Sequence, residues 1–245
     1  MSDDEAINQL AKSCEGVRFK TLLWGNFSRE QVSYIGPFDE FDAKYSADYA
    51  KQIQERIDAA RARASAGRQM FRNDSIFRLS RAYTTSSNDG EMQACLELGL
   101  TSYFDYAGTR GNVNEVTKND FADPIGSCII LVTSDGLFPF GRRAKKVEVN
   151  PGRIFSFGGF FDPSMDKDAR GLPDLFSCFR RELHEELGLN FDKVEINFLG
   201  LIYDMVHPHP EAFALAIPSD MTAAIVKSSN WREELDDIEL VERFM

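Results

Sequence analysis

The run Arg181-Glu182-Leu183-His184-Glu185-Glu186-Leu187-Gly188-Leu189 is the stretch of this sequence that decides the fold. On a helix, residues three and four apart are neighbours, so the side chains of Glu182, Glu185 and Glu186 project to adjacent positions. Three carboxylates packed together repel one another, which costs stability unless a cation is present. Oxygen ligands grouped in this way suit Mg²⁺ or Mn²⁺. The run therefore predicts a metal site on one face of a helix.

A helical wheel places two of these glutamates beside the core. At about 100° per residue, Glu182 and Glu186 border an apolar stripe, and Arg181, Asp174 and Ser177 are expected on the opposite face. The stripe consists of Leu175, Phe176, Phe179, Leu183 and Leu187. A carboxylate at the edge of a core needs a partner. That partner is an arginine if the glutamates are structural and a metal if they are functional. A solvated acidic face is the third alternative.

The residues before the helix add a double glycine. The segment Phe157-Gly158-Gly159-Phe160-Phe161-Asp162-Pro163 predicts a short strand, at residues 154–157, that ends in a turn. The helix is expected over Pro173–Leu187, with Pro173 as its first residue and Gly188 just beyond its end.

The pattern Arg-Glu-apolar-x-Glu-Glu-x-Gly-apolar resembles the second half of the Nudix box. That box is the signature of hydrolases acting on nucleoside diphosphates linked to another group, and the double-glycine strand resembles its opening. Two features depart from the family pattern. An apparent insertion around Asp166–Gly171 lengthens the spacing from Gly159 to the helix, and Pro173 stands where the family usually has a glutamate, eight residues before the arginine. That glutamate is commonly accessory, so its loss affects rate and metal number more than reaction class.

The resemblance implies an α+β fold in two parts. A Nudix α/β/α sandwich with a mixed sheet is expected at residues 119–245, preceded by a smaller N-terminal α+β domain at residues 1–118.

The resemblance also implies how the helix works. Glu182, Glu185 and Glu186 are expected to hold Mg²⁺, with Mn²⁺ as an alternative, and the metal lowers the pKa of an attacking water. Arg181 is expected to orient a glutamate of the box without touching the substrate. The alternative for Arg181 is an ordinary exposed helix arginine.

Other segments resemble the branch of this family that cleaves UDP-glucose or UDP-galactose to UMP and a hexose 1-phosphate. In chain order they are Phe77-Arg78-Leu79, Leu98–Tyr103, Ala107-Gly108-Thr109, Ala122–Gly126 and Leu137–Arg143. That branch also has a small N-terminal domain and a stretched, degenerate box, so the resemblance accounts for both departures.

Candidate residues outside the box come from a late strand and the loop before it. Nudix enzymes often recruit an extra carboxylate from outside the box, so Glu211 is a candidate ligand or general base, the alternative being a plain strand-end carboxylate. His207 and His209 could bind metal or move protons. The prolines beside them favour a rigid surface loop instead.

Three kinds of side chain or backbone are candidates for contacts with the substrate. Arg142 or Arg143 could clamp the diphosphate, the alternative being a solvated hairpin end. Gly159 lies in the double glycine that opens the box. Tyr103 could stack on a uracil base, although buried packing explains an aromatic residue equally well.

The remaining elements follow from alternation and turn residues. Strands are expected at residues 17–23, 76–81, 127–133, 137–142, 196–203 and 212–217. The third and fourth of these are expected to pair through a hairpin turn at residues 134–136. Apolar residues at every fourth position from Phe41 to Ile57 predict a long helix ending near Gly67. Residues 99–111 are expected to form a connection.

Composition narrows the class of partner. The chain has 245 residues, 43% of them hydrophobic, and 20 phenylalanines, which suits a packed core. Its net charge of −11 argues against nucleic-acid polymers, which bind through excess Lys and Arg. A small substrate linked to a nucleoside diphosphate remains compatible, because a bound cation inverts the local charge.

Cysteine usage and apolar runs bear on location. The four cysteines form no CxxC pair, so neither a zinc site nor a disulfide framework is expected. The acidic segment Met1–Glu5 does not resemble a signal peptide, and no apolar run approaches membrane-spanning length. We therefore expect a soluble, cytoplasmic protein with no membrane partner. Its oligomeric state is not determined by the sequence.

Two other functions compete with cleavage of a nucleotide sugar. The same chemistry could act on ADP-ribose, NAD(H) or coenzyme A, because loops outside the box choose the substrate. A catalytically silent module that binds a nucleotide or a protein is the other alternative. Pro173 favours the silent module, whereas Glu182 and Glu186 argue against it.

Overall fold

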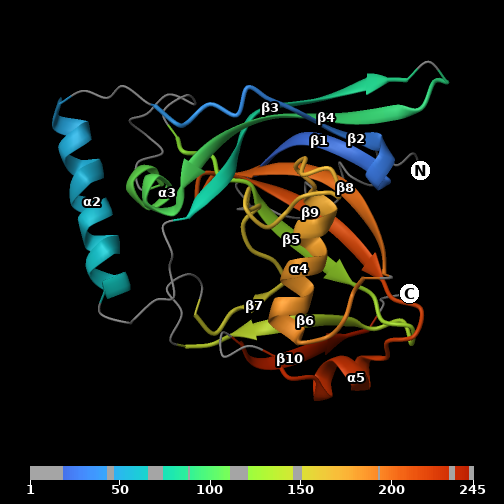
Figure 1. The fold of residues 1–245 in the computed structure, drawn as a ribbon. Coiled ribbons are helices and arrows are strands. Elements are labelled where there is room, and N and C mark those ends of the chain that lie inside the picture. The colour runs from blue at the N-terminus through green and yellow to red at the C-terminus, as the bar shows by residue number, and fades with distance from the viewer. Residues whose placement is uncertain are drawn as a thin grey trace.

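The computed structural model of the chain describes residues 19–42, 47–65, 74–87, 89–110, 121–145, 151–192, 194–231 and 235–242. Three sheets organise these residues, and helix α4 (Leu175–Leu187) packs against the largest of them. Figure 1 shows α4 in front of strands β5 and β9 of that sheet.

The largest sheet is mixed, and its strands lie in the order β1-β8-β9-β5. Strands β5 and β9 run parallel, whereas the β1–β8 and β8–β9 pairs are antiparallel. The strands are β1 (Phe19–Phe27), β5 (Gly126–Leu131), β8 (Glu195–Asp204) and β9 (His209–Ile217). The prediction of a mixed α+β fold is confirmed, as are the strands expected in these segments among the described residues.

The second sheet has the order β2-β4-β3, with β2 parallel and β3 antiparallel to β4. Its strands are β2 (Val32–Ile35), β3 (Ser75–Ser86) and β4 (Met92–Ser102), and the 3-10 helix η1 (Arg29–Gln31) precedes β2. One end of the β3–β4 hairpin extends away from the body of the molecule (Figure 1). The long helix is confirmed as α2 (Ala47–Ser65). Phe41 lies before it and donates its backbone N–H to Leu100, and Gly67 lies outside the described residues.

The prediction that residues 99–111 form a connection is wrong. Strand β4 continues to Ser102, and helix α3 (Tyr103–Thr109) follows at once. Ser102 caps this helix: its hydroxyl accepts from the Asp105 backbone N–H, and Asp105 accepts from the Ser102 N–H. Ser and Asp three residues apart form a capping box that the sequence itself displays.

The hairpin expected between residues 127–133 and 137–142 is also wrong in its pairing. The turn exists, since Gly136 donates its N–H to Thr133 and Thr133 to Leu137. Both edges of β5 are occupied, however, by β9 on one side and by residues 157–160 on the other. The returning strand β6 (Phe138–Arg143) therefore joins a third sheet. Its other strands are β7 (Ile154–Phe155) and β10 (Leu235–Val241), and α5 (Ala223–Ser228) packs on β6 and β10.

One hydrophobic core crosses the expected domain division. Phe77 of β3 packs against Phe161 in a tilted arrangement with ring centroids 4.5 Å apart, and both belong to the core that contains the α4 stripe. Strand β1 likewise joins the sheet of the C-terminal half. The division at residues 118 and 119 lies outside the described residues and stays a prediction.

The described cysteines and helices complete the description of the fold. Cys95, Cys128 and Cys178 are free and buried. Across the described residues, the helices are too short or too polar to cross a membrane.

Candidate active site

Helix α4 is fixed in place at both ends. The carboxylate of Asp174 accepts from the backbone N–H groups of Phe176 and Ser177, at 3.3 and 3.1 Å, and so caps the helix. Arg29 pairs with the same carboxylate at 2.5 Å. Gly188 ends the helix at φ 65°, a conformation that suits glycine. Pro173 therefore lies before the cap, and its predicted place as the first helical residue is wrong.

The apolar stripe of α4 is confirmed, because its five predicted residues are each at most 1% exposed. Glu182 and Glu186 lie beside it as predicted and are 6% and 7% exposed. The side chain of Glu185 is 23% exposed. A solvated acidic face is thus excluded for the first two glutamates, which need partners inside the protein.

The double glycine, Gly158 and Gly159, contacts both buried glutamates. The backbone N–H of Gly158 donates to Glu186 Oε2 at 2.9 Å. A Cβ atom at Gly159 would lie 2.5 Å from Glu182 Oε1, and one at Gly158 would lie 1.9 Å from the backbone oxygen of Ser127. Gly158 also has φ 149°, which L residues rarely adopt. Glycine at position 159 therefore allows the loop to lie directly against the Glu182 carboxylate, and glycine at position 158 allows it to lie against the backbone of Ser127.

Arg181 turns toward the site, contrary to the prediction from the helical wheel. Its side chain is 16% exposed, and Nη1 donates to Glu182 at 2.5 Å and approaches Glu185 at 3.4 Å. Its Nε and Nη2 donate to Asp166 at 2.7 and 2.8 Å. Asp174, also expected to face solvent, is 2% exposed because it caps the helix. The arginine that a purely structural role would require is therefore present beside the glutamates.

The charge of Glu182 is nevertheless poorly compensated. Burial raises the pKa of its carboxyl to about 7, an effect that Arg181 opposes and Glu185 reinforces. Burial also works against the charge of Arg181, but hydrogen bonds to Asp166 and the charge of Glu182 raise the pKa of the guanidinium above its ordinary value. One cation is shared among three carboxylates. A further positive charge beside Glu182 would stabilise its ionised form.

The chemistry of this cluster fits a hard divalent cation, since the candidate donors are carboxylate oxygens. The bare backbone at Gly159 also leaves space against Glu182 that a side chain would fill. Within the described part of the chain, no three His, Cys, Asp or Glu side chains lie close enough together to hold one ion as they stand. Arg181 holds two of the three glutamates, so metal binding requires these carboxylates to turn toward the ion.

A second polar cluster lies where β9 begins. Glu211 Oε1 lies 2.7 Å from His209 Nε2, and the other ring nitrogen faces the carbonyl of His207. The hydroxyl of Tyr106 lies 3.3 Å from that nitrogen. Both nitrogens thus face acceptors, which favours the doubly protonated ring. The pKa of His209 is raised accordingly: burial lowers it, but the hydrogen bond and charge of Glu211 outweigh burial.

The two clusters are connected through paired backbone. Glu211 lies over Gly126, where an added Cβ would be 3.1 Å from its Oε1. Gly126 bridges to Phe160, the residue after the double glycine. His209 is 7% exposed and contacts the rings of Tyr106 and Phe160, so the prediction that it lies in a surface loop is wrong.

The remaining candidates have other surroundings. Arg142 donates to Glu239 of β10 at 3.0 and 2.7 Å and to the carbonyl of Gly152, which is a structural ion pair between strands. Arg143 lies over the ring of Phe155. Tyr103 is 5% exposed and packs edge-on against Tyr106 and Phe160. Their roles toward a substrate stay predictions.

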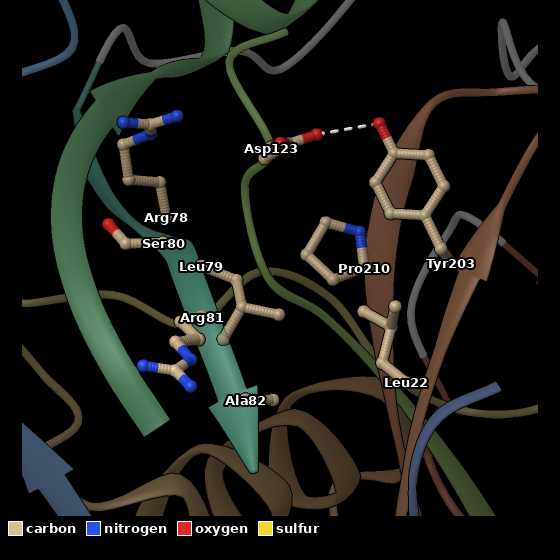
Figure 2. A pocket seen from close by; sticks show the side chains of 9 residues that line it. All are labelled: Leu22, Arg78, Leu79, Ser80, Arg81, Ala82, Asp123, Tyr203 and Pro210. Carbon is tan, nitrogen blue, oxygen red and sulfur yellow. Dashed lines mark hydrogen bonds between the residues drawn. The ribbon is translucent and has the colours of Figure 1, made fainter. Parts of the chain in front are cut away.

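A cavity of about 330 Å³ lies apart from the glutamates, between β3, β8 and β9. Figure 2 shows the Asp123 carboxylate hydrogen-bonded to the Tyr203 hydroxyl at one side of the cavity, with Pro210 below them. That bond measures 2.7 Å. Among the described residues that line this cavity there is no glutamate of α4. The chemistry of the cluster, and not the size of a cavity, therefore defines the candidate site.

The chain is similar to Nudix hydrolases, as the motif of its helix predicts. No protein-family model matches the chain. Among solved structures, the NUDIX domain of NrtR from Shewanella oneidensis, complexed with ADP ribose, is similar with a TM-score of 0.38 and 16% identity. That match covers 52% of this chain and 77% of the other.

The particular relatives carry the name uridine diphosphate glucose pyrophosphatase NUDT22. The mouse protein (Mus musculus) is 35% identical over 136 residues, which is 46% of this chain and 44% of the mouse protein. The human protein (Homo sapiens) is 29% identical over 136 residues, covering 46% of this chain and 45% of the human protein. The chain thus matches less than half the length of these relatives.

Proposed function

We propose that this protein is a Mg²⁺-dependent hydrolase that cleaves the diphosphate of a nucleoside-diphosphate sugar. The observation that carries the proposal is the pair of buried glutamates, Glu182 and Glu186, against the bare backbone of Gly158 and Gly159. Buried carboxyls with a raised pKa, such as that of Glu182, are concentrated at functional sites. UDP-glucose is the first substrate to test, because the named relatives are UDP-glucose pyrophosphatases.

In the proposed reaction, water attacks one phosphorus of the diphosphate and the phosphoanhydride bond breaks, giving UMP and a hexose 1-phosphate. Glu182, Glu185 and Glu186 would hold Mg²⁺, which neutralises charge on the diphosphate and acidifies a bound water. Arg181 contacts Glu182 and Glu185 through Nη1, and these two carboxylates would turn from it toward the ion. Glu211 is the candidate acceptor for the proton of the attacking water, and His209 fixes the position of its carboxylate through the 2.7 Å contact.

The test is product analysis after incubation with UDP-glucose, ADP-ribose, NADH and coenzyme A, with and without Mg²⁺. We expect Mg²⁺-dependent release of UMP and glucose 1-phosphate, and loss of that release in Glu182→Gln. Glu195→Gln, which changes an exposed glutamate at the start of β8, is the matched control and should retain activity. Cleavage of another substrate instead would retain the reaction class and reject the nucleotide sugar.

The ion pair between Arg181 and Glu182 supports a second candidate, a silent module that binds a nucleotide or a protein. In that case no substrate is cleaved with any divalent metal. Isothermal titration with UDP-glucose separates the two functions, since the silent module would bind it equally well in the wild type and in Glu182→Gln and release no product.

A further inference from the structure

Asp166 lies in the insertion that lengthens the Nudix box, yet it is one of the most buried charged residues of the described chain. Its exposure is 1%, and it accepts two parallel hydrogen bonds from Arg181, Nε to Oδ1 at 2.7 Å and Nη2 to Oδ2 at 2.8 Å. A two-point contact of this kind fixes the plane of a guanidinium as well as its position.

We propose that Asp166 is a positioning residue for the metal-binding glutamates, acting through Arg181; this inference rests on the proposed function. Pro173 stands where the family resemblance places a carboxylate. The insertion supplies another carboxylate from a different position in the chain.

The loop is folded so that Asp166 cannot easily turn away. Its Oδ2 accepts from the backbone N–H of Asp162 at 2.8 Å, and its own N–H donates to the Asp162 carbonyl at 2.9 Å. Its carbonyl accepts from the N–H of Asp174, the residue that caps α4. The insertion is thus tied to the helix cap and to the start of the loop, and it holds Asp166 against Arg181.

The distribution of hydrogen bonds explains what Asp166 does to the site. With Nε and Nη2 directed to Asp166, Arg181 presents Nη1 to Glu182 and Glu185. Without Asp166, Nη2 would keep its 2.9 Å hydrogen bond to the Phe160 carbonyl, but Nε would lose its partner and the guanidinium could turn further toward the two glutamates. A metal would then have to displace a stronger ion pair, so the affinity for metal should fall.

The experiment compares Asp166→Asn, Asp166→Glu and a matched control, Asp168→Asn. Asp168 lies in the same insertion, but its partners are Arg170 and the Leu172 N–H and not the helix. For each variant we would measure kcat, KM for UDP-glucose, the Mg²⁺ concentration giving half-maximal activity, and Mn²⁺ binding by electron paramagnetic resonance. Thermal unfolding checks that each variant folds.

Asp166→Asn should weaken metal binding and lower kcat by about 10- to 100-fold, as loss of a residue behind the metal ligands usually does. KM should stay within about 2-fold, Asp166→Glu should restore part of the loss, and Asp168→Asn should match the wild type. If Asp166→Asn does not fold, Arg181→Lys, which keeps the charge and loses the fork, should produce the same weakening.

Unchanged metal affinity in Asp166→Asn, or an equal loss in Asp168→Asn, would overturn the inference. The Mn²⁺ measurement keeps this test separate from the proposed function, because it needs no turnover. A wild-type protein that binds Mn²⁺ but cleaves no substrate would reject the hydrolase, and the variants would still decide the role of Asp166. A wild-type protein that binds no Mn²⁺ would reject both proposals.

Discussion

The two polar clusters of this molecule balance their charges in different ways. At α4, Arg181 is shared among Asp166, Glu182 and Glu185. At the start of β9, Glu211 faces a single partner, the buried ring of His209. In the first cluster one guanidinium contacts three carboxylates, whereas in the second one imidazole contacts one carboxylate. The comparison teaches that α4 is the cluster that an added cation would stabilise, which is what the proposed function requires.

The largest expected effect tests the α4 side of this comparison. Glu182→Gln should lower kcat by at least about 1000-fold, since the metal contributes several kcal/mol to the transition state and about 1.4 kcal/mol corresponds to a tenfold change. Glu211→Gln, measured in the same assay, should lose about 100-fold, as expected for one general base. Equal losses in the two variants would show that the clusters do not differ as proposed.

A smaller loss is expected when the space beside Glu182 is filled. In Gly159→Ala the new methyl group would lie 2.5 Å from the Glu182 carboxylate, so the side chain must move. We expect kcat to fall about 100-fold, because a displacement of about 1 Å at a reacting centre costs roughly that much. The protein should remain folded by circular dichroism, and wild-type turnover would mean that Glu182 does not act at this position.

The uncompensated charge of Glu182 should also appear as a pH dependence of stability. The pKa of its carboxyl rises from 4.5 in the unfolded chain to about 7 in the folded protein. Below pH 4.5 both states are protonated. Between the two values the unfolded state loses its proton first, so Glu182 increasingly destabilises the fold, and above pH 7 the penalty is constant.

Glu182→Gln removes this penalty. Measured in EDTA by urea unfolding, the stability of the variant relative to wild type should grow by up to about 3 kcal/mol between pH 4.5 and pH 7. If the difference in unfolding stability between the variant and the wild type does not change between pH 4.5 and pH 7, the pKa of Glu182 is not raised in the folded protein.

At the β9 cluster, we expect His209→Asn to reduce kcat about 10-fold. The substitution removes the partner of Glu211 but leaves the carboxylates of α4 in place. The Mg²⁺ concentration for half-maximal activity should not change, and the kinetic assay over a range of Mg²⁺ measures both quantities. A large change in the Mg²⁺ concentration for half-maximal activity would instead indicate that the two clusters form one metal site.

The smallest effect is expected for Arg142→Ala. Arg142 pairs with Glu239 at a partly exposed position, which is worth at most about 1 kcal/mol. KM for UDP-glucose should stay within about 2-fold, with a small drop in melting temperature. A large rise in KM would instead support the predicted clamp on the diphosphate.

The sequence predicts α4 well because its signals are local. The burial of the stripe and of Glu182 and Glu186 follows from a period of 3.6 residues, and Gly188 marks the end of the helix. The capping box at Ser102 and Asp105 is an equally local signal, although it lies in the segment that we expected to be a connection.

Other features depend on contacts that no local pattern contains. The pairing of β6 with β10 joins Arg143 to Leu235. Asp166 contacts Arg181 because the insertion folds back onto helix α4. His209 is covered by Tyr106, which lies far from it in the chain. The helical wheel misplaces Arg181 for the same reason, because its buried partner Asp166 comes from another loop, whereas the resemblance to the Nudix box implies a contact between Arg181 and a glutamate.

The pairing of β1 with β8 has a consequence for synthesis of the protein. Phe19 pairs with Asp204, so β1 leaves the ribosome long before its neighbour in the sheet exists. At about 5 to 20 residues per second, the delay is roughly 10 to 40 seconds. During this time Leu23 and Phe27 of β1, which are buried in the folded protein, lack their sheet partner. Pairing over so long a stretch of chain also slows folding, so the nascent protein is expected to depend on chaperones until β8 has been made.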